Sequence, residues 1–145
     1  MKTCIQLILF TLLIATAGVV KSDDYGRVTV DYVADITDGD TFKATIVQWP
    51  PIIGHRIPVR IAHIDTPEFR AKCPAELALA LRAKQFTAAR LYRADHIELR
   101  KVKRGSFFRI TAEVWVDGKS LGQMLMDASL AKPYSRTNPV DWCKE

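Results

Sequence analysis

The sequence lacks the motifs that mark several common classes of enzyme. It has no glycine-rich phosphate-binding loop, no CxxC pair, no internal repeat and no low-complexity stretch. The three histidines have no metal-binding spacing relative to one another; they are His55, His63 and His96. Three serines that could act as nucleophiles, Ser106, Ser120 and Ser129, do not lie in a nucleophile-elbow sequence. These absences argue against a P-loop, a CxxC metal or redox site and a serine hydrolase of the nucleophile-elbow type.

The first 22 residues have the composition of a targeting segment. Lys2 gives a short positive start, residues 4–20 are almost wholly apolar, and Ala15-Thr16-Ala17 places small residues at a cleavage position. We therefore predict a signal peptide over residues 1–22, cut near residue 17 or 22, followed by one domain over residues 23–145. The alternative is an uncleaved membrane anchor, for which the apolar run is a little short.

Charge and cysteine content are consistent with an exported domain that binds a polyanion. The chain has a formal net charge of +5, and loss of residues 1–17 removes one lysine and no acid. Such a charge suits nucleic acid, although ordinary solubility charge is the better explanation when the net charge is considered alone. Cys73 and Cys143 remain after cleavage, and an oxidising compartment favours one disulfide between them over two free thiols.

The periodicity of apolar residues predicts a small mixed α+β domain. Alternation predicts strands over residues 28–36, 42–46, 57–62, 97–102 and 107–116, and helical spacing covers residues 74–93 and 121–128. In the longer helix Leu77, Leu81, Ala88, Leu91 and Tyr92 fall near one apolar face. About five strands with a long helix and a short second helix fit a five-stranded OB-fold-type β-barrel.

Two short acidic motifs follow strands that could be neighbours. Asp38-Gly39-Asp40-Thr41 separates the first two predicted strands, and Asp65-Thr66-Pro67-Glu68 follows the third. Taken alone, the first motif is typical of a plain hairpin turn. The second also has the spacing of a helix capping box, with Pro67 at the helix start. Together they predict that Asp40 and Asp65 converge on one divalent cation, with the Thr66 carbonyl completing the protein ligands.

Three further side chains fit phosphodiester cleavage around that cation. Glu68 is close enough in sequence to hold an attacking water as general base. Arg60 and Arg109 come from different strands, each opposite the apolar set, and could clamp the phosphate from two sides. For either arginine alone, a solvated strand residue is the simpler interpretation.

These residues resemble the thermonuclease (staphylococcal nuclease-like) family over most of the chain, from about Val28 to Tyr134. The motifs that carry the resemblance are Asp38-Gly39-Asp40-Thr41, the run from Val59 to Glu68, the run from Arg109 to Lys119, and Leu130-Ala131-Lys132. The resemblance implies an OB-fold barrel and calcium-dependent hydrolysis of DNA and RNA that leaves 3′-phosphate ends.

The resemblance also implies roles for individual residues. Asp40 and Asp65 match the metal ligands, with Thr66 contributing its carbonyl. Glu68 matches the base or water-orienting residue. Arg60 and Arg109 match the residues that bind the scissile phosphate.

The chain departs from the family pattern in two regions. A tyrosine of the family pattern is replaced by Phe107, which can stack on a base but cannot donate a hydrogen bond. Tyr134 is a candidate for part of the nucleotide pocket. The loop after Glu68 is shorter, and we predict that a Cys73–Cys143 disulfide ties the shortened C-terminus to it.

The sequence therefore predicts a secreted or periplasmic, Ca²⁺-dependent endonuclease of low sequence specificity. DNA and RNA are the expected partners, single strands the expected preference, and a monomer without stable membrane association the expected state once the signal is cut. The alternative is a binding module with the same barrel that holds nucleic acid without cleaving it.

Overall fold

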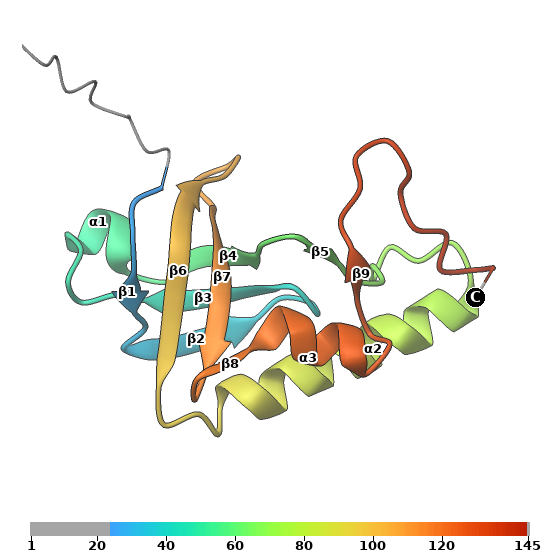
Figure 1. The fold of residues 1–145 in the computed structure, drawn as a ribbon, viewed down its shortest axis with the longest axis horizontal. Coiled ribbons are helices and arrows are strands. Elements are labelled where there is room, and N and C mark those ends of the chain that lie inside the picture. The colour runs from blue at the N-terminus through green and yellow to red at the C-terminus, as the bar shows by residue number, and fades with distance from the viewer. Residues whose placement is uncertain (1–23, 145) are drawn as a thin grey trace, which may run out of the picture.

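The computed structural model describes residues 24–144, so the predicted signal peptide lies outside the described residues. None of the helices within this range has the length and hydrophobicity needed to span a bilayer. Nine strands and three helices follow one another along the described chain (Figure 1): β1 Val28–Thr29, β2 Tyr32–Ile36, β3 Thr41–Thr45, α1 Pro51–Gly54, β4 Ile57–Ile61, β5 Ile64–Asp65, α2 Pro74–Leu91, β6 Ile97–Arg104, β7 Ile110–Val116, β8 Lys119–Ser120, α3 Leu121–Asp127 and β9 Lys132–Pro133.

The main sheet is curled and mixed, and residues 28–36 lie on both of its edges. Its strand order is β1-β6-β7-β4-β3-β2, with β8 added to β7, and only the β4–β7 pair is parallel. At one edge the Val30 N–H donates to the Ile97 carbonyl at 3.0 Å, and at the other the Asp31 N–H donates to the Thr45 carbonyl at 3.0 Å. One continuous segment therefore joins the two edges, as a barrel requires.

The predicted fold class is confirmed. The five strands of five or more residues are β2, β3, β4, β6 and β7, and the long and short helices α2 and α3 lie against each other beside the sheet (Figure 1). The sheet is a curled half-barrel of the OB type with a small second sheet formed by β5 and β9.

Several boundaries differ from the predicted ones. The single strand expected over residues 28–36 bends at Val30–Asp31 and contributes β1 and β2 to different partners. The strand expected from residue 107 starts at Ile110, because Phe107 and Phe108 have positive φ values of 54° and 61° that belong to a turn. The helix α1 and the two-residue strands β5, β8 and β9 were not predicted.

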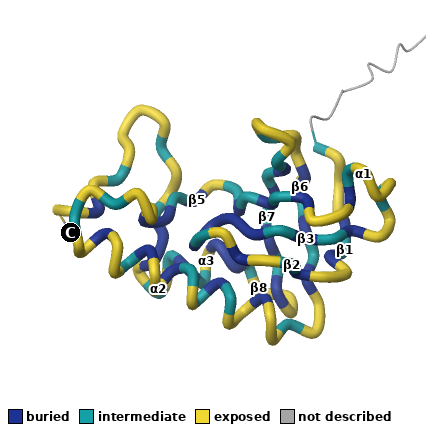
Figure 2. The backbone as a smooth tube through the Cα atoms, turned by 180° about the vertical axis from the view of Figure 1, so that it is seen from behind, coloured by how far each residue is buried: buried dark blue, intermediate teal, exposed yellow. Residues whose placement is uncertain are grey.

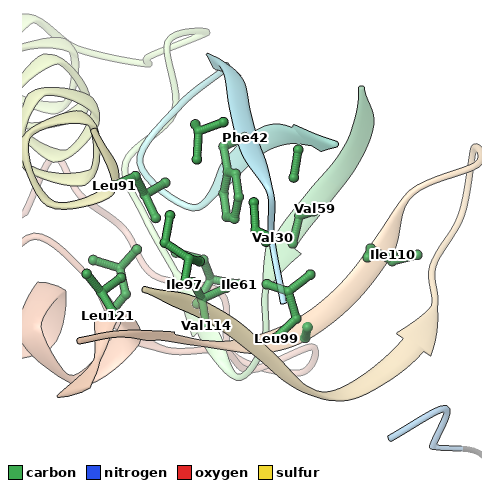
Figure 3. Close-up of a cluster of buried hydrophobic side chains, with 14 of the residues drawn as sticks. Val30, Phe42, Val59, Ile61, Leu91, Ile97, Leu99, Ile110, Val114 and Leu121 are labelled. Carbon is green, nitrogen blue, oxygen red and sulfur yellow. The ribbon is translucent and has the colours of Figure 1, made fainter. Parts of the chain in front are cut away.

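Alternation along the long strands builds the core. The burial of β4 and β7 alternates at every residue, and Figure 2 shows buried and exposed positions following one another along the sheet. The inward set includes Phe42, Val59 and Val114, which lie together in Figure 3 and are at most 1% exposed. Arg60 and Arg109 consequently fall on the opposite, outer face, as the sequence predicts.

The buried face of α2 agrees only in part with the one that the sequence pattern indicated. Leu77 and Leu81 are 41% and 47% exposed, and Tyr92 is also exposed. Leu91 is buried as predicted, and the helix also buries Ala80, Ala83 and Thr87 together with Glu76. Small side chains on this face let the helix axis approach the β2–β3 turn closely, so the bulky leucines are left outside.

A disulfide joins Cys73, at the start of α2, to Cys143 near the C-terminus, with the two Cα atoms 6.0 Å apart. Cys73 is also the N-cap of α2, and its sulfur accepts from the Glu76 N–H at 3.5 Å. The Glu76 carboxylate in turn accepts from the Lys72 N–H at 2.7 Å, which completes a cap of the box type. The disulfide therefore attaches the C-terminal segment to the segment that follows Glu68.

Candidate active site

The turn that carries Asp40 is held by its own backbone and by β4. The N–H groups of Thr37 and Asp38 donate to the Thr41 carbonyl at 2.9 Å and 3.1 Å, which closes the hairpin predicted from the sequence. The Ile61 N–H donates to the Asp40 carbonyl at 2.8 Å. The end of β4 therefore fixes the position of the Asp40 backbone.

Gly39 allows α2 to lie directly against this turn. A Cβ on Gly39 would stand 2.7 Å from the Ala83 Cβ and 3.1 Å from the Thr66 Cβ, so no larger residue fits without movement. The Thr87 hydroxyl donates to the Gly39 carbonyl at 2.6 Å and is fully buried. The turn is thus packed between α2 and Thr66, which is itself 2% exposed.

Asp65 reaches the same region through the small second sheet. It is the last residue of β5, and β5 pairs antiparallel with β9, so that Ile64 faces Pro133 and Asp65 faces Lys132. This short pairing turns the chain after β4 so that the Asp65 carboxylate comes within reach of Arg60.

Arg60 joins the two carboxylates that the sequence predicted to converge. Its Nη1 lies 2.7 Å from the Asp40 carboxylate, and its Nη2 donates to Asp65 Oδ1 at 3.2 Å. The guanidinium thus contacts both predicted metal ligands. The sequence assigned Arg60 to the phosphate alone and did not predict these ion pairs.

The environment of Asp40 disfavours an unneutralised carboxylate. The side chain is 1% exposed, and burial raises the pKa of Asp40 to about 7 against the opposing effect of Arg60. Oδ1 accepts from Arg60 and from the Thr41 hydroxyl at 2.8 Å, whereas the buried Oδ2 has no hydrogen-bond donor. Nη1 lies within ion-pair distance of Oδ2, but only Oδ1 receives a hydrogen bond.

Two more carboxylates act electrostatically on this centre. Burial, followed by the charge of Asp38, raises the pKa of Glu68, with Asp65 adding to the effect. The Asp38 charge also raises the pKa of Asp40, and Asp38 Oδ1 accepts from the Asp40 N–H at 3.2 Å. The sequence analysis gave Asp38 no role, although its place two residues before Asp40 was a usable signal.

The capping-box interpretation of Asp65 and Glu68 does not apply. Residues 66–72 contain no helix, and α2 starts at Pro74 with the Cys73–Glu76 cap described above. Pro67 is fully buried within the irregular segment. Asp65 and Glu68 are therefore free of the structural role that competed with catalysis.

Arg109 lies outside the carboxylate centre. Thr111 faces Arg60 in the parallel β4–β7 pair, and Arg109 directly precedes β7, two residues before Thr111, so alternation places it on the same outer face as Arg60. Its buried Nε has no hydrogen-bond partner, and no ion pair holds its side chain within residues 24–144. Its guanidinium is therefore free to bind an anion that reaches this face.

The two predicted substrate-binding aromatics occupy different places. Tyr134 lines a groove of about 290 Å³ together with His63, Lys101, Lys103 and Thr111, which we call the Tyr134 groove. The Tyr134 N–H donates to the His63 carbonyl at 2.9 Å. Phe107 is 97% exposed at the turn between β6 and β7 and does not line this groove.

One group of potential metal ligands in the described chain can be set aside. Cys73, Glu76 and Cys143 have ligand atoms within 4.8 Å of one another. Both sulfurs belong to the disulfide and have no thiolate to offer. Glu76 already caps α2, so this group stabilises the structure and is not a metal site.

A model of the family of staphylococcal nuclease homologues matches residues 58–144. The chain belongs to this family. No curated protein matches it. The match contains Arg60, Asp65, Glu68 and Arg109 but begins after Asp40, so the association of Asp40 with the others rests on the ion pair with Arg60. The chain therefore carries a nuclease-like or nucleic-acid-binding OB-fold domain.

Proposed function

We propose that the protein is a Ca²⁺-dependent endonuclease that hydrolyses phosphodiester bonds in DNA and RNA with low sequence specificity. The observation that carries the proposal is that Asp40 and Asp65, from two separate strand ends, both contact the Arg60 guanidinium. A pure binding surface has no need of buried carboxylates, since they repel the phosphates it must attract.

The donor set fits a hard divalent cation. Asp40 and Asp65 would hold it through carboxylate oxygens and Thr66 through its carbonyl, all of which are oxygen ligands of the kind that Ca²⁺ prefers. The buried Oδ2 of Asp40 receives no hydrogen bond but lies 2.7 Å from Arg60 Nη1, so a cation would share this oxygen with Arg60. When bound, the cation neutralises phosphate charge and polarises the P–O bond.

The neighbouring side chains would bind the phosphate and activate the attacking water. Arg60 and Arg109 lie on one face of the sheet and would bind the phosphate oxygens, with their strongest effect on the charge that develops at phosphorus. Glu68 would orient and deprotonate the attacking water. A raised pKa suits a general base, because it brings proton affinity closer to the working pH.

We further propose that the protein works outside the cytoplasm, as a secreted or periplasmic monomer that prefers single strands. The Cys73–Cys143 disulfide supports an oxidising compartment. The exposed aromatic side chains of Phe107 and Tyr134 support a preference for unpaired bases, whose faces are free to stack.

The competing function is a nucleic-acid-binding module without catalysis. The observation in its favour is that Arg60 already pairs with both carboxylates, while Arg109 contacts neither. In that case the arginines would serve affinity alone, and Asp40 would serve only to hold Arg60.

Digestion of labelled single-stranded DNA tests the proposal. The purified protein is incubated with calcium and with chelator, beside Glu68→Gln, which keeps the size of the side chain and removes its basicity. We expect calcium-dependent cleavage that leaves 3′-phosphate ends and falls by about 10²–10⁴-fold in the variant.

Circular single-stranded DNA serves as the second substrate, because only an endonuclease opens it. Binding of both substrates without cleavage under any divalent cation would establish the binding module and overturn the proposed enzyme. Cleavage that persists in chelator would contradict the calcium requirement alone.

A further inference from the structure

A second groove adjoins the Tyr134 groove at Lys103, which lines both. It has a volume of about 400 Å³ and is lined by Tyr25 and Trp49, by Lys103 and Arg104, and by the apolar side chains of Ile57 and Ile110. We call it the aromatic groove. Its lining residues belong mainly to the segment before β1, the chain around α1 and the end of β6, elements that can be located in Figure 1.

Both aromatic side chains of this groove are attached to ordered backbone. The Tyr25 N–H donates to the Val102 carbonyl at 2.8 Å, while the Tyr25 side chain remains 75% exposed. The Trp49 N–H donates to the Ile46 carbonyl at 3.1 Å, and a Cβ on Gly54 would come within 2.9 Å of the Trp49 Cβ. The backbone that carries the two rings is therefore fixed before any ligand arrives, which reduces the entropy lost on binding.

The cations of the aromatic groove are available to a ligand. Lys103 and Arg104 form no ion pair with an acidic residue in the part of the chain that the structure describes, and the Arg104 guanidinium only covers the Phe108 ring at 4.8 Å. Among residues 24–144, no acidic side chain lines the groove. Its chemistry therefore combines flat apolar surfaces with unneutralised positive charge.

Lys103 connects the two grooves, since it lines both of them. A strand that places one nucleotide in the Tyr134 groove can therefore reach the aromatic groove across the end of β6 without leaving positively charged surface. Continuity with the Tyr134 groove and charge complementarity both select the same occupant, which is an unpaired stretch of nucleic acid.

We propose that the aromatic groove is a second nucleotide subsite, in which Tyr25 and Trp49 stack on a base while Lys103 and Arg104 contact the adjoining phosphates. This inference rests on the proposed function, because it concerns the same substrate. Stacking on an aromatic ring tolerates any base, so the subsite adds affinity for longer strands and little sequence preference. Single strands are selected, because a paired base has no free face.

The test measures binding separately from cleavage. Oligothymidylates of two and of eight nucleotides are titrated into the purified protein in chelator at low salt, and tryptophan fluorescence and the dissociation constant are recorded. We expect the octanucleotide to quench the fluorescence of Trp49, one of three tryptophans, and the Trp49→Phe variant to lose that signal. The dinucleotide occupies one subsite only and serves as the internal reference.

Matched variants separate the contribution of the aromatic groove to binding from that of other exposed residues. Tyr25→Ala should weaken octanucleotide binding about tenfold and leave dinucleotide binding unchanged. The control Tyr92→Ala removes another exposed tyrosine, at the end of α2, and should change neither. Arg104→Ala should lower the salt dependence of octanucleotide binding by about 0.7 in log–log slope, whereas Arg93→Ala should not.

Equal affinities of Tyr25→Ala and Tyr92→Ala for the octanucleotide, or no quenching of Trp49, would overturn the subsite. Because the titration contains no cation, it does not depend on turnover. If the protein binds with the expected length dependence but never cleaves, the proposed nuclease activity is contradicted and the proposed subsite stands. If the protein cleaves but Tyr25→Ala does not change octanucleotide binding, the nuclease activity stands and the subsite is contradicted.

Discussion

The carboxylate centre and the β6–β7 turn differ in how their side chains are held. At the centre, Asp40 is 1% exposed, its backbone is bonded to β4, and its turn is packed against α2. At the turn, Phe107 is 97% exposed, and the Arg109 side chain has no bonding partner within residues 24–144. The difference indicates that the side proposed to bind the metal is held rigidly in advance, whereas the side proposed to meet the substrate is left free to adjust.

The largest effect is expected from the disulfide that encloses the carboxylate side. Replacing both Cys73 and Cys143 by serine should lower the free energy of unfolding by about 4 kcal/mol, because the bond closes a long loop over a sequence separation of 70. Denaturant unfolding of the variant and of the oxidised parent measures this loss in the free energy of unfolding. A loss below about 1 kcal/mol would mean that the C-terminal segment is held mainly by other contacts, among them the buried Trp142.

The second prediction compares the two arginines. Arg60→Ala should lower the free energy of unfolding by about 3 kcal/mol, because it leaves the buried Asp40 carboxylate without its partner. Arg109→Ala breaks no ion pair and should change stability by less than about 0.5 kcal/mol. Both should lose turnover.

Thermal unfolding of the two variants in chelator, beside single-turnover cleavage in calcium, separates these effects. The double variant Asp40→Asn with Arg60→Ala provides the control, since removing the carboxylate charge should restore much of the lost stability. Equal destabilisation by both arginine variants would contradict the contrast between the two regions.

The third prediction concerns the packing that fixes the Asp40 turn. Gly39→Ala should destabilise the fold by about 2 kcal/mol, because the new Cβ would stand 2.7 Å from the Ala83 Cβ. Ala83→Gly removes the obstructing methyl group, so the double variant should be less destabilised than the sum of the single ones. Additive effects in this double-mutant cycle would show that the turn is not held by α2.

The smallest effect on stability is expected at the β6–β7 turn. Phe107→Ala should leave the unfolding free energy within about 0.5 kcal/mol of the parent, since the ring is almost fully solvated. Its affinity for single-stranded DNA should fall severalfold if the ring stacks on a base. Phe108→Ala, which removes the ring under Arg104, is the neighbouring control. Unchanged affinity in Phe107→Ala would remove it from the substrate-binding residues.

Long elements could be predicted from the sequence because their periodicity is visible. The alternation in β4 placed Arg60 on the outer face correctly, and Arg109, directly before β7, continues the alternating burial of that strand. The strands β5 and β9 have two residues each and offer no period to detect. Their pairing nevertheless turns Asp65 toward Arg60, so this part of the site depends on contacts that sequence patterns do not report.

The orientation of α2 shows a second reason why sequence patterns do not predict the whole structure. Large apolar residues usually mark the buried face of a helix, which favoured Leu77 and Leu81. The neighbour of α2 is a glycine turn, and close approach to a turn requires alanine and threonine at the contact.

The dependence of cleavage rate on calcium concentration tests the central claim most directly. It is measured on circular single-stranded DNA for the parent, for Asp40→Asn and for Asp35→Asn, which alters an exposed carboxylate on β2. The account predicts saturation with calcium in the parent and in Asp35→Asn, and loss of calcium-stimulated cleavage in Asp40→Asn, which should remain folded. Cleavage by Asp40→Asn with an unchanged calcium dependence would contradict it, because the cation that matters would then bind elsewhere.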